Sequence, residues 1–271
     1  MNPTFLQDIY EATQQRKNRG SLEDLRQRAL SARRPYGFVD IFSPSVTSPQ
    51  RAQPCIIAEV KFARPGKGMI AHSFDPVEVS SGYLANGAAA ISVLTEPTYF
   101  KGSLRFLRDI RQKHPAAKLL MNDFIFEEYQ LLEGRIAGAD AILLIAALLT
   151  FDRLKHLYTQ ALALQLTPLV EVHTEEELAS VLSLGVPLIG VNNRNLKTLT
   201  IDLGISERLI KKVPPWVFVM SESGLSQPEE ITRLHAAGFH GFLMGSHFMT
   251  TPNPGASLGG FLKEVEHGRQ R

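Results

Sequence analysis

Short runs of apolar residues recur along the chain after residue 54, and stretches with the 3.6-residue periodicity of helices lie between them. The apolar runs cover residues 56–60, 88–94, 119–121, 141–145, 169–172, 188–191, 217–220 and 241–244. The helical stretches cover residues 75–85, 103–113, 126–137, 152–164, 175–184, 204–211, 228–237 and 256–265. A strand that is apolar throughout is covered on both faces, as parallel strands with outer helices are. The pattern therefore predicts strands and helices that alternate around a parallel sheet.

Two architectures hold such a sheet, a closed (β/α)8 barrel and an open doubly wound sheet. An open sheet usually carries a G-x-G-x-x-G turn after its first strand, which binds a dinucleotide. Residues 59–68 follow the first apolar run and lack that spacing. A length of 271 residues suits one barrel with a modest extension. The sequence therefore predicts the α/β class, with a single (β/α)8 TIM barrel and an N-terminal helical extension.

The residues before the first predicted strand indicate two helices and a connection. Residues 2–17 carry apolar side chains at helical spacing, and residues 21–30 open with a serine cap followed by acidic residues. Residues 31–54 are rich in proline and serine and are expected to run over the surface. We therefore divide the chain into an extension with its connection over the barrel mouth, residues 1–54, and a barrel, residues 55–271.

The composition is that of an ordinary soluble enzyme. The formal net charge is +2, with 44% hydrophobic and 21% charged residues, which gives no global reason to expect nucleic acid or a membrane as partner. The N-terminus has no basic region followed by an apolar core, and no apolar run reaches the roughly 20 residues that cross a bilayer. A single cysteine, Cys55, excludes an internal disulfide and fits a reducing cytoplasm. We expect a cytoplasmic monomer or weak homodimer.

Polar residues close most of the apolar runs, and in a barrel the carboxyl ends of the strands form the active site. Glu171 is the first choice for a general base, because a partly desolvated strand-end carboxylate is suited to accept a proton near neutral pH. The alternative for Glu171 is a structural ion pair with a nearby lysine. His173 follows it on the same strand and is expected to pack or hydrogen-bond beside it.

The ends of the last two predicted strands indicate a phosphate site. Ser223-Gly224 and Gly245-Ser246 follow these strands, and barrels frequently hold phosphate between the corresponding loops with backbone N–H groups. One such pair is most often a plain turn, but two at consecutive strand ends favour a phosphorylated small-molecule substrate. No histidines and carboxylates have metal-ligand spacing, so we expect neither a metal nor a cofactor.

Longer segments at the strand ends carry a family resemblance over nearly the whole chain. They are Ile56-Ile-Ala-Glu-Val-Lys61, Ala90-Ile-Ser-Val-Leu-Thr95, Phe100-Lys-Gly-Ser103, Asn122-Asp-Phe-Ile125, Gly138-Ala-Asp-Ala-Ile-Leu-Leu-Ile145, Leu169-Val-Glu-Val-His173, Ile189-Gly-Val-Asn-Asn-Arg194 and Ser221-Glu-Ser-Gly224. Together they resemble the indole-3-glycerol phosphate synthase family, barrel enzymes of tryptophan biosynthesis. The resemblance implies a carbon-carbon lyase that closes an indole ring with loss of carbon dioxide and water. The two N-terminal helices match the family's extension, which packs across the barrel mouth.

The resemblance also implies roles for individual residues. Glu171 would be the general base of the dehydration, and Lys61, oriented by Glu59, would bind substrate and donate a proton. The pocket around the anthranilate ring and the ribulose hydroxyls would be shaped and charged by Asn192, Arg194 and Glu222. The phosphate would be held by Ser223, Gly224, Gly245 and Ser246. The wall of the ring site would consist of Phe100, Phe124, Leu143 and Leu196.

The chain departs from the family pattern at two positions. The family has a lysine in place of Asn122, and that lysine is its general acid, protonating the substrate carbonyl oxygen as the ring closes. An asparagine can donate a hydrogen bond but cannot release a proton. The family's Ser-Pro-Ser segment after the first strand is here Arg64-Pro65-Gly66, so that Arg64 adds a positive charge near the expected phosphate while a serine hydroxyl is lost.

Three interpretations of the function follow. In the first, the chain is a synthase whose acid role has moved to Lys61 or to a water held by Asn122. In the second, it is a paralogue that acts on a different amino-sugar phosphate or aryl-amine substrate in specialised metabolism. In the third, it is a catalytically silent ligand-binding barrel. A phosphoribosyl isomerase is disfavoured, because those barrels rely on paired aspartates where this chain has Glu59 and Glu171.

Overall fold

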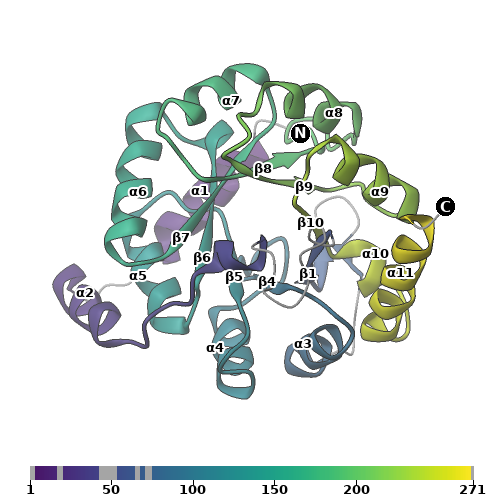
Figure 1. Cartoon of the computed structure of the whole chain (residues 1–271). Helices are drawn as coiled ribbons and strands as arrows, with labels where there is room; N and C mark the ends of the chain where they lie inside the picture. Colours follow the sequence, from purple (N-terminus) through teal and green to yellow (C-terminus); the bar gives the residue numbers. More distant parts are fainter. Residues whose placement is uncertain (1–3, 17–20, 43–53, 65–67, 71–74, 270–271) are drawn as a thin grey trace.

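A closed barrel of parallel strands forms the centre of the molecule (Figure 1). The computed structural model describes residues 4–16, 21–42, 54–64, 68–70 and 75–269. The barrel strands are β1 (Cys55–Val60), β4 (Ala90–Leu94), β5 (Leu119–Asn122), β6 (Ala141–Ile145), β7 (Thr167–Val172), β8 (Leu188–Asn192), β9 (Phe218–Glu222) and β10 (Gly241–Met244). They follow one another in chain order around the barrel, and β10 closes it against β1. The predicted (β/α)8 barrel is confirmed.

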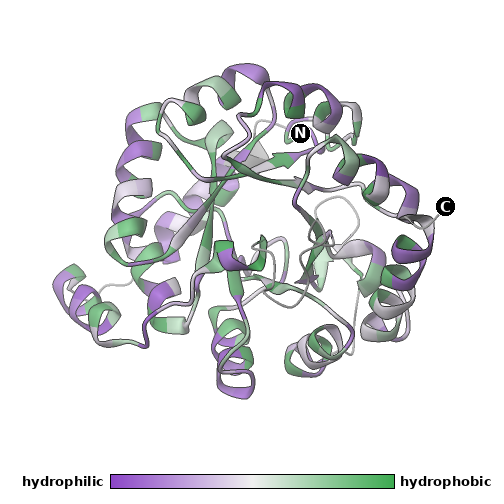
Figure 2. Cartoon of the chain, in the orientation of Figure 1, coloured by the Kyte–Doolittle hydropathy of each residue, from purple (hydrophilic) through white to green (hydrophobic). Residues whose placement is uncertain are grey.

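A ring of helices covers the outside of the barrel (Figure 1). These helices are α3 (Pro76–Ala85), α4 (Leu104–Lys113), α5 (Glu128–Ala137), α6 (Phe151–Ala163), α7 (Glu175–Leu182), α8 (Gly204–Leu209), α9 (Pro228–Ala237) and α11 (Pro254–Arg269). Each lies within a few residues of a predicted helix. Their polar faces point outward and their apolar faces toward the strands (Figure 2), as the periodicity of the sequence predicts.

Local sequence signals fix several of the helix ends. Side chains of Ser103 and Thr150 accept hydrogen bonds from backbone N–H groups in the first turns of α4 and α6. Gly138 and Gly238 end α5 and α9 in the left-handed region, with φ of 98° and 118°. The chain can then turn directly into the next strand.

Several short elements have no counterpart in the sequence prediction. They are β2 (Ala63–Arg64), β3 (Gly68–Met69), η1 (Phe38–Phe42), η2 (Ala146–Leu148), η3 (Ile210–Lys212) and α10 (Ser246–Met249). Strands β2 and β3 pair with each other in a small antiparallel sheet beside the end of β1. These segments are too short to show a hydrophobic period, so only tertiary contacts define them.

The expected surface connection over residues 31–54 is wrong for the segment η1. Phe38 and Phe42 are buried, and the Phe42 ring stacks on Phe218 at the start of β9 with ring centroids 5.2 Å apart. Apolar side chains from η1 therefore fill the end of the barrel at which the strands begin. Residues 43–53, the rest of the predicted connection, lie outside the described residues.

Two further helices precede the barrel, α1 (Thr4–Arg16) and α2 (Leu22–Ser31). The end of α1 lies against the segment that follows β5, where Arg16 Nη2 is 3.4 Å from Asp123 Oδ1 and the Tyr129 hydroxyl donates to the Thr13 carbonyl. Helix α2 packs on α5. Helix α1 is thereby attached next to Asn122 at the carboxyl end of β5.

The division of the chain after residue 54, into an extension and a barrel, stays a prediction.

One buried carboxylate joins the segment before η1 to the barrel. Asp140 is fully buried and pairs with Arg33 and Arg111, and it accepts hydrogen bonds from the backbone N–H groups of Tyr36 and Leu119. The Arg111 guanidinium is itself nearly buried. Loss of the carboxylate would leave an uncompensated positive charge in the interior.

We predict that Asp140→Ala lowers the free energy of unfolding by about 3–5 kcal/mol, because it breaks a buried ion pair and leaves Arg111 without its partner. Urea denaturation followed by circular dichroism measures the change. The matched control is Asp109→Ala, which removes a solvent-accessible carboxylate from the pair with Arg105 on α4. This control variant should lower the free energy of unfolding by less than about 0.5 kcal/mol. Equal losses in the two variants would contradict this account of Asp140.

Candidate active site

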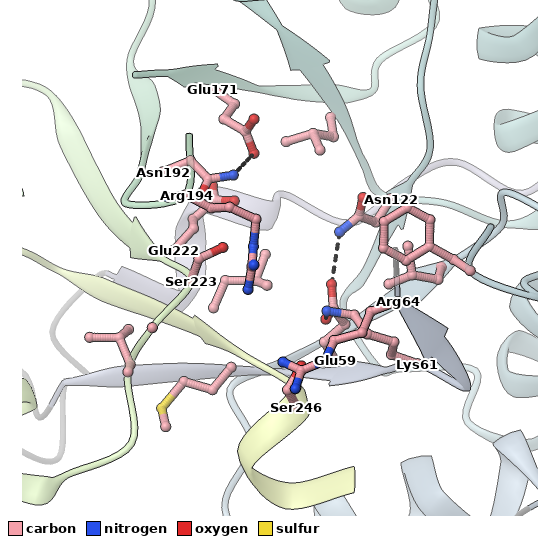
Figure 3. A pocket seen from close by; sticks show the side chains of 18 of the residues that line it. Glu59, Lys61, Arg64, Asn122, Glu171, Asn192, Arg194, Glu222, Ser223 and Ser246 are labelled. Atoms are coloured by element: carbon pink, nitrogen blue, oxygen red, sulfur yellow. Dashed lines mark hydrogen bonds and ion pairs between the residues drawn. The ribbon is translucent and has the colours of Figure 1, made fainter. Parts of the chain in front are cut away.

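A cavity of about 380 Å³ opens at the carboxyl ends of the barrel strands. Apart from His173, every residue that the sequence singles out for the site lines it, and these residues come from the barrel strands and the loops that follow them (Figure 3). These residues are Glu59, Lys61, Arg64, Phe100, Asn122, Phe124, Leu143, Glu171, Asn192, Arg194, Leu196, Glu222, Ser223, Gly224, Gly245 and Ser246. The barrel thus gathers into one cavity residues up to 187 positions apart, from Glu59 to Ser246.

On one side of the cavity, Glu59 joins Lys61 to Asn122. The Lys61 ammonium forms an ion pair with Glu59 Oε2, and the Asn122 amide donates to Glu59 Oε1 over 2.9 Å (Figure 3). Glu59 is buried, whereas the Lys61 side chain keeps 15% of its surface exposed. Asn122 therefore helps to orient the Glu59 carboxylate, which in turn orients Lys61. Among the described residues that line the cavity, Lys61 carries the one ammonium group.

On the other side, Glu171 is held by side chains from two neighbouring segments. Asn192 at the end of β8 donates to Glu171 Oε2 over 2.9 Å (Figure 3), and His173 Nε2 lies 3.3 Å from Glu171 Oε1. The predicted contact of His173 with Glu171 is confirmed. Glu171 is only 2% exposed, so its carboxylate meets protein groups and the cavity, with little contact to bulk water. A buried carboxylate oriented in this way can act as a base.

A third glutamate, Glu222, lies beside Glu171 within hydrogen-bonding reach. Burial raises the pKa of Glu222 well above its usual range, and the negative charges of Glu171 and Glu59 raise it further. Neither Glu222 Oε1 nor Glu171 Oε1 has a hydrogen-bond donor among the described residues. A hydrogen bond between these two carboxyls therefore requires that one of them carry a proton.

Space for the Glu222 carboxyl is provided by a glycine that the sequence prediction missed. Gly190 on β8 pairs in register with Glu171 on β7, and a Cβ at Gly190 would overlap the Glu222 carboxyl. Gly245 has the same relation to Glu59. The signal in the sequence was a glycine inside an apolar strand, which often marks a close approach of another group.

Two guanidinium groups, Arg64 and Arg194, line the cavity, and that of Arg64 lies near Ser246 (Figure 3). Arg64 Nε is buried without a hydrogen-bond partner in the described chain. Burial lowers the pKa of Arg194, and the neighbouring charge of Arg64 lowers it further. Neither arginine forms an ion pair with a carboxylate of the described residues, so both charges remain available to an anion.

The loop after β9, which lines the cavity, has an unusual backbone. Ser223 and Gly224 both have positive φ, 65° and 85°. The Asn193 amide donates to the carbonyl oxygens of Glu222 and Ser223 over 3.0 and 3.1 Å. This buried amide holds the turn, and no specific feature of the sequence indicated that role.

Glu96 and Asp123 also line the cavity, although the sequence did not assign them a role there. Glu96 accepts hydrogen bonds from the backbone N–H groups of Thr98, Tyr99 and Phe100, and thereby fixes the loop that carries the Phe100 ring. These contacts are formed by the folding of a loop, and no sequence spacing predicts them.

The described residues contain no group of three histidine, cysteine or acidic side chains that could hold a metal ion. None of the helices described is long and apolar enough to span a bilayer.

The fold and the cavity together define a (β/α)8 barrel protein with a carboxylate-rich cavity at the carboxyl ends of its strands, the position of the active site in barrel enzymes. A sequence model of the indole-3-glycerol phosphate synthase family matches residues 3–259. The chain belongs to this family.

Relatives with this family name are similar over most of their length. The indole-3-glycerol phosphate synthase of Aliarcobacter butzleri is 41% identical over 254 residues, covering 92% of this chain and 95% of that protein. The enzyme of the same name from Bacteroides thetaiotaomicron is 46% identical over 213 residues, covering 78% of this chain and 80% of that protein. The predicted family resemblance is confirmed.

Solved structures of low sequence identity support the fold alone. KGPDC from Streptococcus mutans has a TM-score of 0.60 at 13% identity and covers 80% of this chain and 99% of its own. Thiamine phosphate pyrophosphorylase from Pyrococcus furiosus has a TM-score of 0.58 at 16% identity, with 79% and 96% covered.

We predict that Glu222→Gln stabilises the protein at alkaline pH. A carboxyl whose pKa is raised on folding contributes stability below its unfolded pKa, and that contribution is lost as pH rises through the folded value. Glutamine cannot ionise, so the melting temperature of the variant should exceed that of the native protein increasingly as the pH is raised over the range above about pH 5. Glu266→Gln, an exposed change on α11, serves as the control and should show no such trend. A constant difference across the range would contradict the prediction.

Proposed function

We propose that the chain is an indole-3-glycerol phosphate synthase that converts 1-(2-carboxyphenylamino)-1-deoxyribulose 5-phosphate, with its acid role moved away from position 122. The observation that carries the proposal is the arrangement of Glu59, which binds Lys61 with one carboxylate oxygen and Asn122 with the other. The residue that cannot release a proton thus helps to orient a neighbouring residue that can.

The chemistry of the reaction defines what the site must supply. The ring carbon that bears the carboxylate bonds to the ketone carbon of the sugar chain, the carboxylate leaves as carbon dioxide, and the ketone oxygen leaves as water. That oxygen must gain two protons. One is balanced by the proton that the methylene carbon next to the amine loses as the ring becomes aromatic. The second must come from solvent through an acid of the protein, so the site needs both a base and an acid.

Lys61 is the proposed acid for the ketone oxygen. Its ammonium group lines the cavity beside Asn122, and the ion pair with Glu59 fixes its position. A positive charge at this point also stabilises the negative charge that develops on the oxygen as the new bond forms. Proton transfer and charge stabilisation can both be provided by one ammonium group.

Glu171 is the proposed base for the methylene proton. Its carboxylate lies across the cavity from Glu59 (Figure 3), so that a substrate lying between them meets an acid and a base on different sides. Asn192 fixes one of its oxygens. The ring of the substrate would pack against the apolar side chains of the cavity, Phe100, Phe124, Leu143 and Leu196.

The remaining anionic group of the substrate is its phosphate. Ser223, Gly224, Gly245 and Ser246 line the cavity next to Arg64, whose guanidinium has no carboxylate partner in the described chain. Backbone N–H groups together with an unpaired guanidinium are well suited to a phosphate dianion. We propose that Arg64 replaces the serine hydroxyl that the family has at this position.

The proposal predicts that the native protein, incubated with this substrate, forms a product with indole fluorescence. In Lys61→Met the rate should fall by about 10²–10⁴-fold, the usual effect of losing a general acid. Lys101→Met is the matched control, since Lys101 is an exposed lysine next to Phe100, and its rate should be unchanged. Undiminished turnover in Lys61→Met would rule out the transfer of the acid role to Lys61.

The variant Asn122→Lys, assayed alongside, separates this proposal from the other interpretations. If only this variant turns over, the cavity still fits the substrate and Asn122 marks a change or a loss of reaction. If neither protein does, the substrate is a different one, or the barrel only binds a ligand.

We also predict that Glu171→Gln lowers kcat by at least about 10²-fold while KM changes little, because the amide keeps the size of the carboxylate and its contact with Asn192 but cannot accept the proton. Steady-state kinetics measures both constants. Equal losses in kcat and in affinity would assign Glu171 to binding.

A further inference from the structure

His173 lies between two glutamates, one in the cavity and one outside it. Its Nε2 atom is 3.3 Å from Glu171 Oε1, and its Nδ1 atom is 3.4 Å from Glu177 Oε2 in the first turn of α7. The backbone N–H of His173 also donates to Glu177 Oε2 over 2.6 Å. Glu177 therefore fixes the position of both the backbone and the ring.

The ring is behind Glu171 as seen from the cavity. His173 is not among the residues that line the cavity, and 9% of its side chain is exposed. In the described part of the chain, Glu171 and Glu177 are the charged groups within ion-pair distance of the ring. The other acidic residues of this turn, Glu175 and Glu176, are exposed, and Glu175 pairs with Lys212. The surroundings of the ring therefore favour its positively charged form.

The buried carboxylates of the cavity require a compensating positive charge next to Glu171. Glu59, Glu171 and Glu222 are each at most 3% exposed, and buried carboxylates at close range cannot all be ionised without compensation. Lys61 compensates Glu59. Within the cavity, Glu171 accepts a hydrogen bond from the neutral amide of Asn192, which supplies no charge. A protonated His173 is the group that can compensate Glu171.

We propose that His173, held by Glu177, is a positioning residue that keeps Glu171 ionised as the base, so that the proton shared by Glu171 and Glu222 resides on Glu222. The inference rests on the proposed function, because it concerns the base of that reaction. His173 touches no substrate and acts through Glu171.

The geometry decides which of the two carboxyls keeps the proton. Asn192 donates a hydrogen bond to one oxygen of Glu171, and His173 Nε2 lies within ion-pair distance of the other. No cation contacts the Glu222 carboxyl among the described ion pairs, and Gly190 leaves it room to lie against Glu171. When environments separate two neighbouring carboxyls in this way, one acts as the base and the other as a neutral acid. Glu222 can then donate a hydrogen bond, either to Glu171 or to a substrate oxygen.

The electrostatics of the pair agree with this assignment. Burial lowers the pKa of His173, but the hydrogen bond to Glu177 and the charges of Glu171 and Glu177 outweigh burial, and the pKa is raised above its ordinary value. Burial raises the pKa of Glu177, but its hydrogen bonds with His173 and the charge of the ring more than reverse this, and the pKa is lowered. Both shifts favour an ion pair of imidazolium and carboxylate.

A purely structural role of His173 would have different consequences. Its backbone contact with Glu177 closes the first turn of α7, and that contact does not depend on the ring. The variant His173→Gln preserves the backbone contact and can still donate a neutral hydrogen bond to Glu171, but it removes the charge. It therefore separates the charge of the ring from the backbone contact that closes the turn.

The first test is the pH profile of kcat/KM in the ring-closing assay. With the cation removed, Glu171 takes up a proton more readily, so the acid limb of the profile should move to higher pH in His173→Gln, by roughly one unit or more. A shift of one unit corresponds to an approximately tenfold lower rate at a pH below the limb. The melting temperature should stay close to that of the native protein. An acid limb at its native position would overturn the proposal.

Two glutamate variants on the same helical turn make a matched pair. Glu177→Gln weakens the positive charge on His173 and should move the acid limb in the same direction, by less. Glu176→Gln removes the same charge from the same turn without touching His173, and it should leave the profile unchanged. Equal shifts in the two variants would assign the effect to the general charge of α7, and the proposal would fail.

A second measurement needs no turnover. In NMR spectra of protein labelled at histidine Cε1, the resonance missing from His173→Gln identifies the ring, and its titration should lie above that of an ordinary histidine. In Glu177→Gln and in Glu171→Gln the midpoint should fall, because each change removes a negative charge next to the ring. A midpoint that moves in neither variant overturns the proposal. If the native protein does not turn over the substrate, the proposed function fails, and this titration still decides whether His173 is the cation beside Glu171.

Discussion

Mutual repulsion between three buried glutamates is the constraint on which the site depends. Glu59, Glu171 and Glu222 face one cavity with almost no exposure to water, where like charges repel far more strongly than in solution. Each carboxyl group has different neighbours. Lys61 and Asn122 bind Glu59, His173 and Asn192 approach Glu171, and burial together with the charges of Glu171 and Glu59 raises the pKa of Glu222. Three residues of one type thereby acquire three different properties.

The closed barrel makes this proximity possible. Strands β1, β7 and β9 carry the glutamates. Asn122 on β5 and Asn192 on β8 reach the carboxylates from strands between them, whereas Lys61 and His173 directly follow β1 and β7. Gly190 and Gly245 provide space for the Glu222 and Glu59 carboxyls, since a side chain at either position would overlap them. The glycines matter as much as the acidic residues, because a carboxyl displaced from its place would lose the neighbours that set its charge.

The presence of Asn122, where the family pattern has a lysine, also affects the charge of this cavity. A second lysine next to Glu59 would add a positive charge to a cavity that already contains Lys61, Arg64 and Arg194. Asn122 keeps the hydrogen bond to Glu59 without adding charge. Arg64 contributes a charge nearer to Ser246, which follows β10. Under the proposed function, this exchange shifts positive charge from the end of β5 toward the loops after β9 and β10.

The sequence by itself determined the alternation of strands and helices and the polar residues at the strand ends, since burial on both faces and helical periodicity are local properties of the chain. Barrel geometry then sufficed to bring Glu59, Glu171 and Glu222 together. The sequence could not determine that Phe42 fills the opposite end of the barrel or that His173 bridges two glutamates. These contacts join segments whose relative positions depend on packing, and only the tertiary structure decides which charged groups share an environment without water.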